Sequence, residues 1–312
     1  MKVLVTGGAG FIGSHTLDAL RARGDETALL DDFNDFYDPA LKRSRATVSG
    51  ARIFEADLRD RSAVRTALQS FRPDAIIHLA ARAGVRPSIE NPRLYLDVNL
   101  TGTLNLLDEA VALGVNRFVF ASSSSVYGNN PKVPFAEHDP LVSIISPYAV
   151  TKLAGEQLCR IHAQLHHLSL TALRFFTVYG PRQRPDLAIS KFVRLISTGR
   201  PVELYGDGST SRDYTYVTDT VSGILAALDR LQPGFRVYNL GGEHPVTLAE
   251  LVAAIERILG RSASIHRLPP QPGDVERTFA DLTLARAELG YSPRVSIADG
   301  LRRYWDWFQA HA

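Results

Sequence analysis

The chain has 312 residues, of which 45% are hydrophobic and 22% charged, as in one large globular domain or two modest ones. Its 35 Lys and Arg residues against 33 Asp and Glu give a net charge of +2, without any run of five like charges. This balance gives no support to a nucleic-acid partner or to binding at a membrane surface. No stretch approaches 18 uninterrupted apolar residues, so a transmembrane segment is not expected.

The sequence also indicates the cellular setting. A single cysteine, Cys159, excludes an intrachain disulfide framework. The opening residues MKVLVTGG lead directly into a predicted strand, without the regions of a secretory leader. We therefore expect a soluble protein of the reducing cytoplasm.

The first half of the chain alternates between strand and helix patterns. Between the apolar runs the spacing is helical; in Thr101–Leu113, for example, apolar residues share one face and Gly114 ends the pattern. This alternation predicts an α/β fold with a doubly wound parallel sheet of the Rossmann type in residues 1–176. The predicted strands are Lys2–Thr6, Thr27–Leu30, Arg52–Ala56, Ala75–His78, Arg117–Ala121 and Leu170–Phe175.

After residue 176 the chain becomes richer in proline, glycine and loops. We expect a smaller, mixed substrate-binding domain in residues 177–312, with the segment 214–240 returning to the first domain. Thr247 and Glu250 form a predicted capping box at the start of a helix. The helices expected here are Leu251–Leu259, Leu282–Leu289 and a last one through Trp305 and Trp307.

A glycine-rich turn joins the first predicted strand to the first helix. Gly7, Gly10 and Gly13 lack a β-carbon, so the backbone can turn tightly and approach a pyrophosphate at the helix N-terminus. Asp31 follows Gly13 by 18 residues, where a carboxylate accepts hydrogen bonds from both ribose hydroxyls. A 2′-phosphate would be repelled by Asp31 and Asp32, so the turn predicts NAD rather than NADP as cofactor.

A second motif carries chemistry. Tyr148 and Lys152 are four residues apart, so on a helix both side chains lie on one face. The hydroxyl cluster Ser122–Ser125 follows a predicted strand at its carboxyl end, where open parallel sheets bind ligands. Together these residues predict an active site beside the dinucleotide.

With these motifs the sequence resembles the extended short-chain dehydrogenase/reductase family, in its NAD-dependent nucleotide-sugar epimerase and dehydratase branch. The resemblance spans essentially the whole chain. The matching features, in order and at family-like spacing, are TGGAGFIG, Asp57 with Leu58, His78–Ala81, Asn99, the serine cluster, Tyr148 with Lys152, RFFTVYGP and RDYTYV.

The resemblance implies that Tyr148 is the base that removes the proton of a sugar hydroxyl. It implies that Lys152 activates Tyr148 and binds the ribose, and that Ser123 hydrogen-bonds the same hydroxyl. One ammonium at roughly 4 Å supplies about 4 kcal/mol, enough to lower a tyrosine pKa by two to three units. The implied cofactor contacts are Gly7, Gly10, Phe11, Ile12, Gly13, Asp31, Asp32, Asn34, Asp57, Leu58, Leu79, Ala80, Ala81, Asn99, Ser122, Tyr148, Lys152 and Phe175.

The residues after the catalytic serine indicate the reaction. Dehydratases and decarboxylases of this branch carry acidic residues there, whereas this chain has Ser124 and Ser125, which cannot act as acid or base at their ordinary pKa. We therefore expect epimerisation at C4 of a UDP-hexose by tightly bound NAD. A dehydratase or decarboxylase, a dehydrogenase that releases a keto sugar, and a non-catalytic NAD-binding sensor remain alternatives.

The sugar is indicated by several phrases of the sequence. YDPALKR, HLAARAGVRPS and RFFTVYGP followed by RPD look most like UDP-glucuronate 4-epimerases, while PYAVTKLAGE and YGDGSTSRDYTYV fit UDP-glucose 4-epimerases equally well. In related enzymes an Arg stands where this chain has Gln271. The exchange of Arg for Gln weakens one charged contact that is expected to the diphosphate. The implied substrate contacts are Arg86, Ser124, Ser125, Thr177, Arg184, Arg212, Gln271 and Asp274; of these, Ser124, Ser125, Thr177 and Arg184 would surround a C6 carboxylate.

The resemblance further implies a homodimer that pairs the helices Thr101–Leu113 and Tyr148–His162. His162 and His166 are spaced like the histidines of a zinc-protease helix, but Ala163 stands where that motif requires glutamate. We therefore expect no metal site and place His162, His166 and His167 on the solvated face of their helix.

Overall fold

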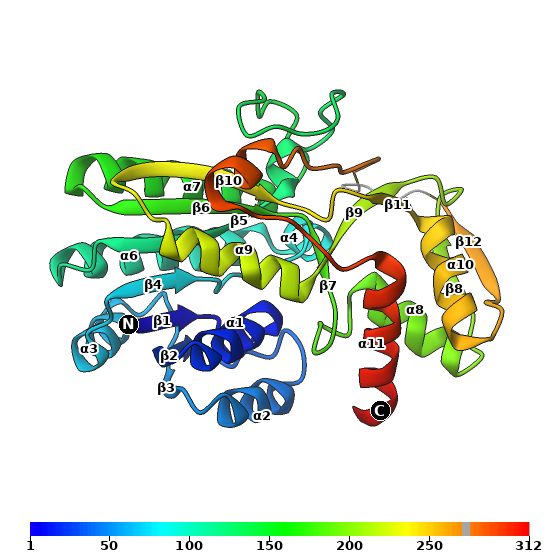
Figure 1. The fold of residues 1–312 in the computed structure, drawn as a ribbon, viewed down its shortest axis with the longest axis horizontal. Coiled ribbons are helices and arrows are strands. Elements are labelled where there is room, and N and C mark those ends of the chain that lie inside the picture. Colours follow the sequence, from blue (N-terminus) through cyan, green and yellow to red (C-terminus); the bar gives the residue numbers. More distant parts are fainter. Residues whose placement is uncertain (270–274, 312) are drawn as a thin grey trace.

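A central parallel sheet organises the molecule (Figure 1). The computed structural model describes residues 1–269 and 275–311, and in these it forms seven strands in the order β10-β6-β5-β4-β1-β2-β3. Each predicted strand is present, with ends shifted by two residues at most, so the predicted fold class is confirmed. The strands are β1 (Lys2–Thr6), β2 (Glu26–Asp31), β3 (Arg52–Glu55), β4 (Ala75–His78), β5 (Arg117–Ser123), β6 (Ser169–Phe175) and β10 (Gly234–Leu240).

Helices cover both faces of this sheet, because its strands are apolar on both sides. Val3 and Val5 belong to a core shared with α1 and α9, whereas Leu4 between them belongs to a core shared with α3, α6 and α7. This alternation produces the doubly wound arrangement. The helices are α1 (Phe11–Ala22) and α9 (Val217–Asp229) on one face, and α3 (Arg61–Phe71), α6 (Gly102–Ala112) and α7 (Pro147–His166) on the other.

The order of the strands reverses between β1 and β4, next to the first strand of the chain. The turn after β1 lies beside the turn after β4, since Leu79 N donates to Thr6 O at 3.1 Å and Ala80 N donates to Thr6 Oγ1 at 3.3 Å. Open α/β sheets bind ligands at such a reversal, at the carboxyl ends of the strands.

Smaller sheets form the second part of the molecule, to the right of the central sheet in Figure 1. The capping box is confirmed: Glu250 N donates to Thr247 Oγ1 at 3.2 Å, and Thr247 N donates to Glu250 Oε2 at 2.8 Å. The elements are β7 (Thr177–Tyr179), β9 (Ser211–Tyr216) and β11 (Pro245–Thr247) in one mixed sheet, β8 (Val202–Tyr205) with β12 (Ile265–Leu268) in another, and α8 (Ala188–Ser197), α10 (Leu248–Leu259) and α11 (Ile297–His311).

The chain crosses between the two parts. After β9 it returns through α9 and adds β10 to the edge of the central sheet, inside the segment 214–240 expected to return. The boundaries 1–176 and 177–312 of the two domains stay a prediction. The remaining elements are α2 (Pro39–Ser49), α4 (Val85–Glu90), α5 (Pro92–Leu96), π-helical Asp97–Thr101 and Ala285–Leu289, and a 3₁₀ turn Ser124–Tyr127.

The expected placement of one histidine on α7 is wrong. His162 is only 8% exposed, because α6 packs beside this face of α7. Its imidazole hydrogen-bonds Leu158 O at 2.9 Å and Asp108 Oδ1 at 3.2 Å. His166 and His167 are exposed, as expected. In residues 1–269 and 275–311 no helix is both long and apolar enough to cross a membrane.

Candidate active site

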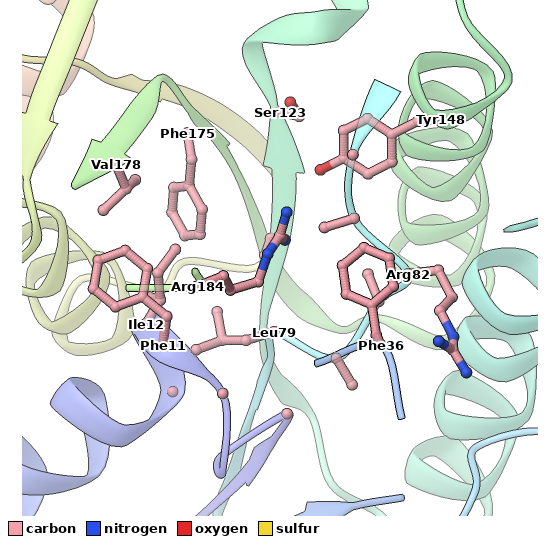
Figure 2. Close-up of a pocket in the computed structure, with 18 of the residues that line it drawn as sticks. Phe11, Ile12, Phe36, Leu79, Arg82, Ser123, Tyr148, Phe175, Val178 and Arg184 are labelled. Carbon is pink, nitrogen blue, oxygen red and sulfur yellow. The ribbon is translucent and has the colours of Figure 1, made fainter. Parts of the chain in front are cut away.

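A pocket of about 450 Å³ lies over the point where the strand order reverses (Figure 2). It adjoins a larger cavity of about 1650 Å³ toward the second part of the molecule, since Thr177, Arg184 and Arg212 line both. Of the expected cofactor contacts, all except Asn99 line the first pocket. They are Gly7, Gly10, Phe11, Ile12, Gly13, Asp31, Asp32, Asn34, Asp57, Leu58, Leu79, Ala80, Ala81, Ser122, Tyr148, Lys152 and Phe175.

The glycine turn brings α1 against the end of β1. Gly7 has φ +69°, and a β-carbon there would lie 2.7 Å from Ala80 N. A β-carbon on Gly13 would lie 2.2 Å from Gly7 O, so only glycine permits this approach. The helix starts at Gly10, and within the described residues no side chain caps it. Its first amides are thus available to a pyrophosphate.

The carboxylate of Asp31 lies at the far end of the turn and is 7% exposed. It accepts hydrogen bonds from Ala9 N at 3.1 Å and Phe33 N at 3.0 Å, and each oxygen keeps a further lone pair for a ribose hydroxyl. Burial raises the pKa of Asp31. Lys42, which the sequence motifs did not single out, donates to the carbonyl and the amide oxygen of Asn34 at 2.8 and 2.9 Å, and so holds the loop that follows.

Asn99 does not reach the pocket. Its side chain accepts from Arg82 N at 2.8 Å and donates to Arg82 O at 3.0 Å and to Thr151 Oγ1 at 3.0 Å. Asn99 is 3% exposed, and its hydrogen bonds hold the backbone of Arg82, which lines the pocket.

Asp57 lines the same pocket at its other end. Arg59 binds Asp57 and holds the pKa of that carboxyl below its usual range.

The three expected catalytic residues meet at the carboxyl end of β5. Ser146 caps α7 by accepting from Ala149 N at 3.2 Å, and this start sets the face that carries Tyr148 and Lys152. Figure 2 shows the side chains of Ser123 and Tyr148 next to each other above Arg184. Lys152 Nζ donates to Ala121 O at 2.7 Å and lies 5.9 Å from the centre of the Tyr148 ring.

The electrostatics add a further group, Arg184, to the activation of Tyr148 that was expected from Lys152. Burial raises the pKa of Tyr148, and the hydrogen bond from Ser123 and the positive charge of Arg184 oppose this rise. Burial lowers the pKa of Lys152 to about 8. The charge of Arg184 therefore acts in the direction of the Tyr148 phenolate, which the sequence motif did not indicate.

The residues expected around the sugar gather beside Tyr148. Ser124, Ser125 and Thr177 line the pocket, and in the described chain the buried Ser125 hydroxyl has no hydrogen-bond partner. Arg184 is 17% exposed, so it is not a solvated charge. Its guanidinium binds both carboxylate oxygens of Asp186, at 2.9 and 2.8 Å.

Two residues near Arg184, the aromatic Phe36 and the basic Arg82, were missed by the sequence motifs. Phe36 lines the pocket, with the Arg184 guanidinium 5.0 Å and the Arg82 guanidinium 5.9 Å from its ring centre (Figure 2). The aromatic residues of the run NDFYDP were the available signal, because they follow the ribose-binding strand directly.

The loop that carries Arg184 is anchored on the cofactor helix α1. His15 hydrogen-bonds Pro181 O at 2.9 Å through Nε2, and Arg182 donates to His15 Nδ1 at 2.8 Å and to Asp18 at 2.6 Å. Arginine only donates, so Nδ1 accepts and the imidazole is neutral with its proton on Nε2. Burial, with the charge of Arg182 next, lowers the pKa of His15 to about 4, in agreement with this state.

The remaining expected substrate contacts, among which the resemblance assigns Arg212 and Asp274 to the diphosphate, lie toward the larger cavity where the structure describes them. Arg86 and Arg212 line it, and the Arg86 guanidinium lies 4.8 Å from the centre of the Tyr205 ring. Gln271 and Asp274 lie outside the described residues. In the part of the chain that the structure covers, no group of three or more His, Cys, Asp and Glu side chains is arranged to hold a metal ion.

The family follows from a comparison with known proteins. The sequence profile of the NAD dependent epimerase/dehydratase family matches residues 3–241. The chain belongs to this family, which confirms the resemblance found in the sequence and the prediction of NAD.

Individual relatives are similar over their full length. A probable UDP-glucuronate 4-epimerase of Rhizobium meliloti (strain 1021) is 41% identical, over 99% of this chain and 97% of that protein. The crystal structure of UDP-glucuronic acid 4-epimerase from Bacillus cereus, in complex with UDP-glucuronic acid and NAD, has a TM-score of 0.93, 35% identity and 99% coverage of both chains. The UDP-glucose 4-epimerase of Thermus thermophilus, in complex with NAD, has a TM-score of 0.92, 37% identity and full coverage of both chains.

The close approach at the glycine turn yields a test. Gly13→Ala should lower NAD affinity at least about tenfold, because the new β-carbon pushes α1 away from the turn. Titration calorimetry with NAD, after removal of any bound cofactor, measures the change. Gly24→Ala is the control for a glycine-to-alanine change outside the turn, since a β-carbon there meets nothing within 4 Å; the positive φ of Gly24, +84°, should cost stability but not NAD affinity. Equal NAD affinity in the two variants would contradict the role of Gly13.

Proposed function

We propose that the chain is an NAD-dependent UDP-sugar 4-epimerase that interconverts UDP-glucuronate and UDP-galacturonate. The observation that carries the choice of sugar is the set Ser124, Ser125, Thr177 and Arg184, which lies beside Tyr148 without an acid among them. Three neutral hydroxyls and one cation suit a carboxylate at C6. The similarity to enzymes described as UDP-glucuronate 4-epimerases supports the same sugar.

In this proposal the residues of the pocket divide the work at C4. Tyr148 removes the proton of the C4 hydroxyl, and Ser123 holds that hydroxyl in place. Bound NAD supplies the acceptor and donor of the hydride. Arg184 stabilises the Tyr148 phenolate by charge, and Lys152, fixed on Ala121 O, adds a second positive charge below the ring.

The neutral donors also protect the substrate. Oxidation of UDP-glucuronate at C4 makes a β-keto acid, which loses carbon dioxide readily when the C5–C6 bond aligns with the carbonyl π system. Several fixed donors hold the carboxylate so that this bond stays out of alignment. The serines at positions 124 and 125 also leave no acid that could assist elimination at C5 and C6.

A neutral UDP-hexose is the second candidate, because of one contact of Arg184. Asp186 binds its guanidinium through Nε and one terminal nitrogen, so a C6 carboxylate must share the cation with Asp186 or replace it, whereas a C6 hydroxyl leaves the pair intact. The similarity to UDP-glucose 4-epimerases agrees with this candidate.

NADH absorbance during incubation with each UDP-sugar distinguishes the classes of protein. An epimerase turns the sugar over without net formation of NADH, whereas a dehydrogenase accumulates NADH. A non-catalytic sensor shows no turnover.

Tyr148→Phe tests the assignment of the base. We expect the purified protein to carry tightly held NAD and the variant to keep it, because the ring is retained. The variant should lose more than nine-tenths of turnover, because it lacks the hydroxyl group that acts as the base. Nicotinamide released on denaturation and the rate of product formation measure the two. Turnover above a tenth of wild type would show that another group is the base.

Arg184→Ala tests the carboxylate site. We expect wild-type enzyme to prefer UDP-glucuronate over UDP-glucose. The variant should lose kcat/KM on both sugars, because Arg184 also acts on Tyr148, but it should lose about 1.5–3 kcal/mol more, roughly ten- to more than a hundredfold, on the acid substrate. Arg59→Ala is the control, because this arginine binds Asp57 at the other end of the pocket and should affect both sugars by one factor. A wild-type preference for UDP-glucose, or an equal loss on both sugars in Arg184→Ala, would favour the neutral hexose.

We further propose a homodimer built on α6 and α7. On α7 the apolar side chains of Val150, Ile161 and Leu165 are 47%, 48% and 69% exposed and follow helical spacing, and Leu104 on α6 is 37% exposed. A cytoplasmic location is proposed with it, because the single cysteine, Cys159, is a buried free thiol.

Light scattering at micromolar concentration should give twice the chain mass of 34.3 kDa. Ile161→Glu should shift the mass toward the monomer, because a carboxylate would be desolvated in the interface. Val48→Glu, on α2, is the control, since Val48 is 74% exposed and lies on a different surface. A monomeric wild-type protein, or dissociation by both variants alike, would argue against this interface.

A further inference from the structure

A buried ion pair lies directly behind the catalytic strand β5. Glu156 on α7 and Arg174 on β6 have side chains only 2% and 4% exposed. Arg174 donates to one carboxylate oxygen through Nε at 2.9 Å and to the other through a terminal nitrogen at 2.8 Å. Ser122 Oγ donates to the same carboxylate at 2.5 Å. The pair therefore joins α7, β5 and β6.

Each member of this cluster stands next to a residue of the active site in the chain. Ser122 precedes Ser123, and Glu156 follows Lys152 by one helical turn. Arg174 precedes Phe175, which lines the cofactor pocket. The cluster thus includes a side chain from each of the two elements, β5 and α7, that carry the proposed proton-transfer residues.

Stability alone is a weak reason for such a pair. Removing two charges from water costs several kcal/mol per ion, and apolar residues of similar volume often serve as well or better. The chain has another buried carboxylate of the same kind, Glu109 on α6, which binds Arg61 at 2.6 Å and Arg65 at 2.8 Å, away from the active site. Glu109 therefore provides a comparison without a catalytic neighbour.

The surroundings of Lys152 show what Glu156 does there. Lys152 is 4% exposed, and its partners on β5 are neutral: the Ala121 carbonyl and the Phe120 ring. Burial lowers the Lys152 pKa to about 8, whereas Cys159 and Glu156 on the same helix act to raise it.

The other titratable groups around Lys152 are neutral near pH 7. Burial raises the Cys159 pKa well above its usual value, so the thiol keeps its proton. Burial lowers the pKa of His78 on β4 to about 3, so the imidazole stays neutral. Tyr148 is a neutral phenol in its resting state, because its pKa is raised. The negative charge that acts on Lys152 is therefore that of Glu156.

Arg174 balances this charge from the side away from Lys152. Its remaining nitrogen donates to Tyr127 OH at 2.8 Å, in the 3₁₀ turn after β5, and to Glu137 O at 3.1 Å, in the segment between that turn and α7. The pair is thus oriented, with the carboxylate on the helix of Lys152 and the guanidinium on β6.

We propose that Glu156 is a positioning residue of the epimerase, which with Arg174 aligns α7 on β5 and β6 and keeps the Lys152 ammonium charged. This inference rests on the proposed function, because it assigns a task in that reaction. It concerns the resting charge of the site rather than the choice of sugar.

The pH profile of kcat tests the inference. If Tyr148 must be ionised and Lys152 protonated, the profile is bell-shaped. Glu156→Gln leaves Arg174 uncompensated, which favours the phenolate and disfavours the ammonium. Both limbs should therefore move to lower pH, by about one unit. Glu109→Gln is the matched control and should lower thermal stability without moving either limb.

Arg174→Met should shift the pH profile in the opposite direction. It leaves the Glu156 carboxylate uncompensated, so both limbs should move to higher pH, and its direction decides the matter if Glu156→Gln fails to fold. Limbs that stay in place in the folded variants, or that move alike in both, overturn the inference and leave the pair a structural one. Wild-type protein that epimerises neither UDP-sugar overturns the proposed function, and the inference with it.

Discussion

The close contact between the start of α1 and the end of β1 is the constraint on which the rest of the site depends. Gly13 lies so near the Gly7 carbonyl that any side chain would displace the helix. The same turn meets the backbone of Ala80 after β4, so it fixes the junction where the strand order reverses. With that junction in place, β2 brings Asp31 to one end of the pocket and β5 brings Ser123 to the other. The cofactor pocket is thus a consequence of backbone contacts more than of side-chain chemistry.

The polar chemistry is added to this frame from segments far apart in the chain. Tyr148 and Lys152 come from α7, whereas Arg184 reaches the same place from the loop after β7. Burial works against both proton-transfer groups, raising one pKa and lowering the other. The site therefore needs compensating charges around it, and a cation on one side and a carboxylate on the other supply them.

The fold could be predicted from the sequence because the central strands are buried on both faces and appear as short continuous apolar runs. The glycine turn, Asp31 and the pair Tyr148 and Lys152 could be found because their chemistry depends on local spacing. Asn99 and His162 could not be placed, and the action of Arg184 on Tyr148 could not be foreseen, since these depend on tertiary contacts: the Arg82 backbone, the α6 surface and the phenol of Tyr148. Local spacing carries no information about such partners.

The anchoring of the Arg184 loop on α1 has a consequence for protein engineering. His15 and Asp18 belong to the helix at the cofactor pocket, yet they hold the backbone and side chain of the loop that carries Arg184. The loop is therefore not an interchangeable module. A chimera that receives this loop from an enzyme with another sugar preference should also receive the anchoring residues of its donor. Without them the transplanted arginine would keep its chemistry but lose its position.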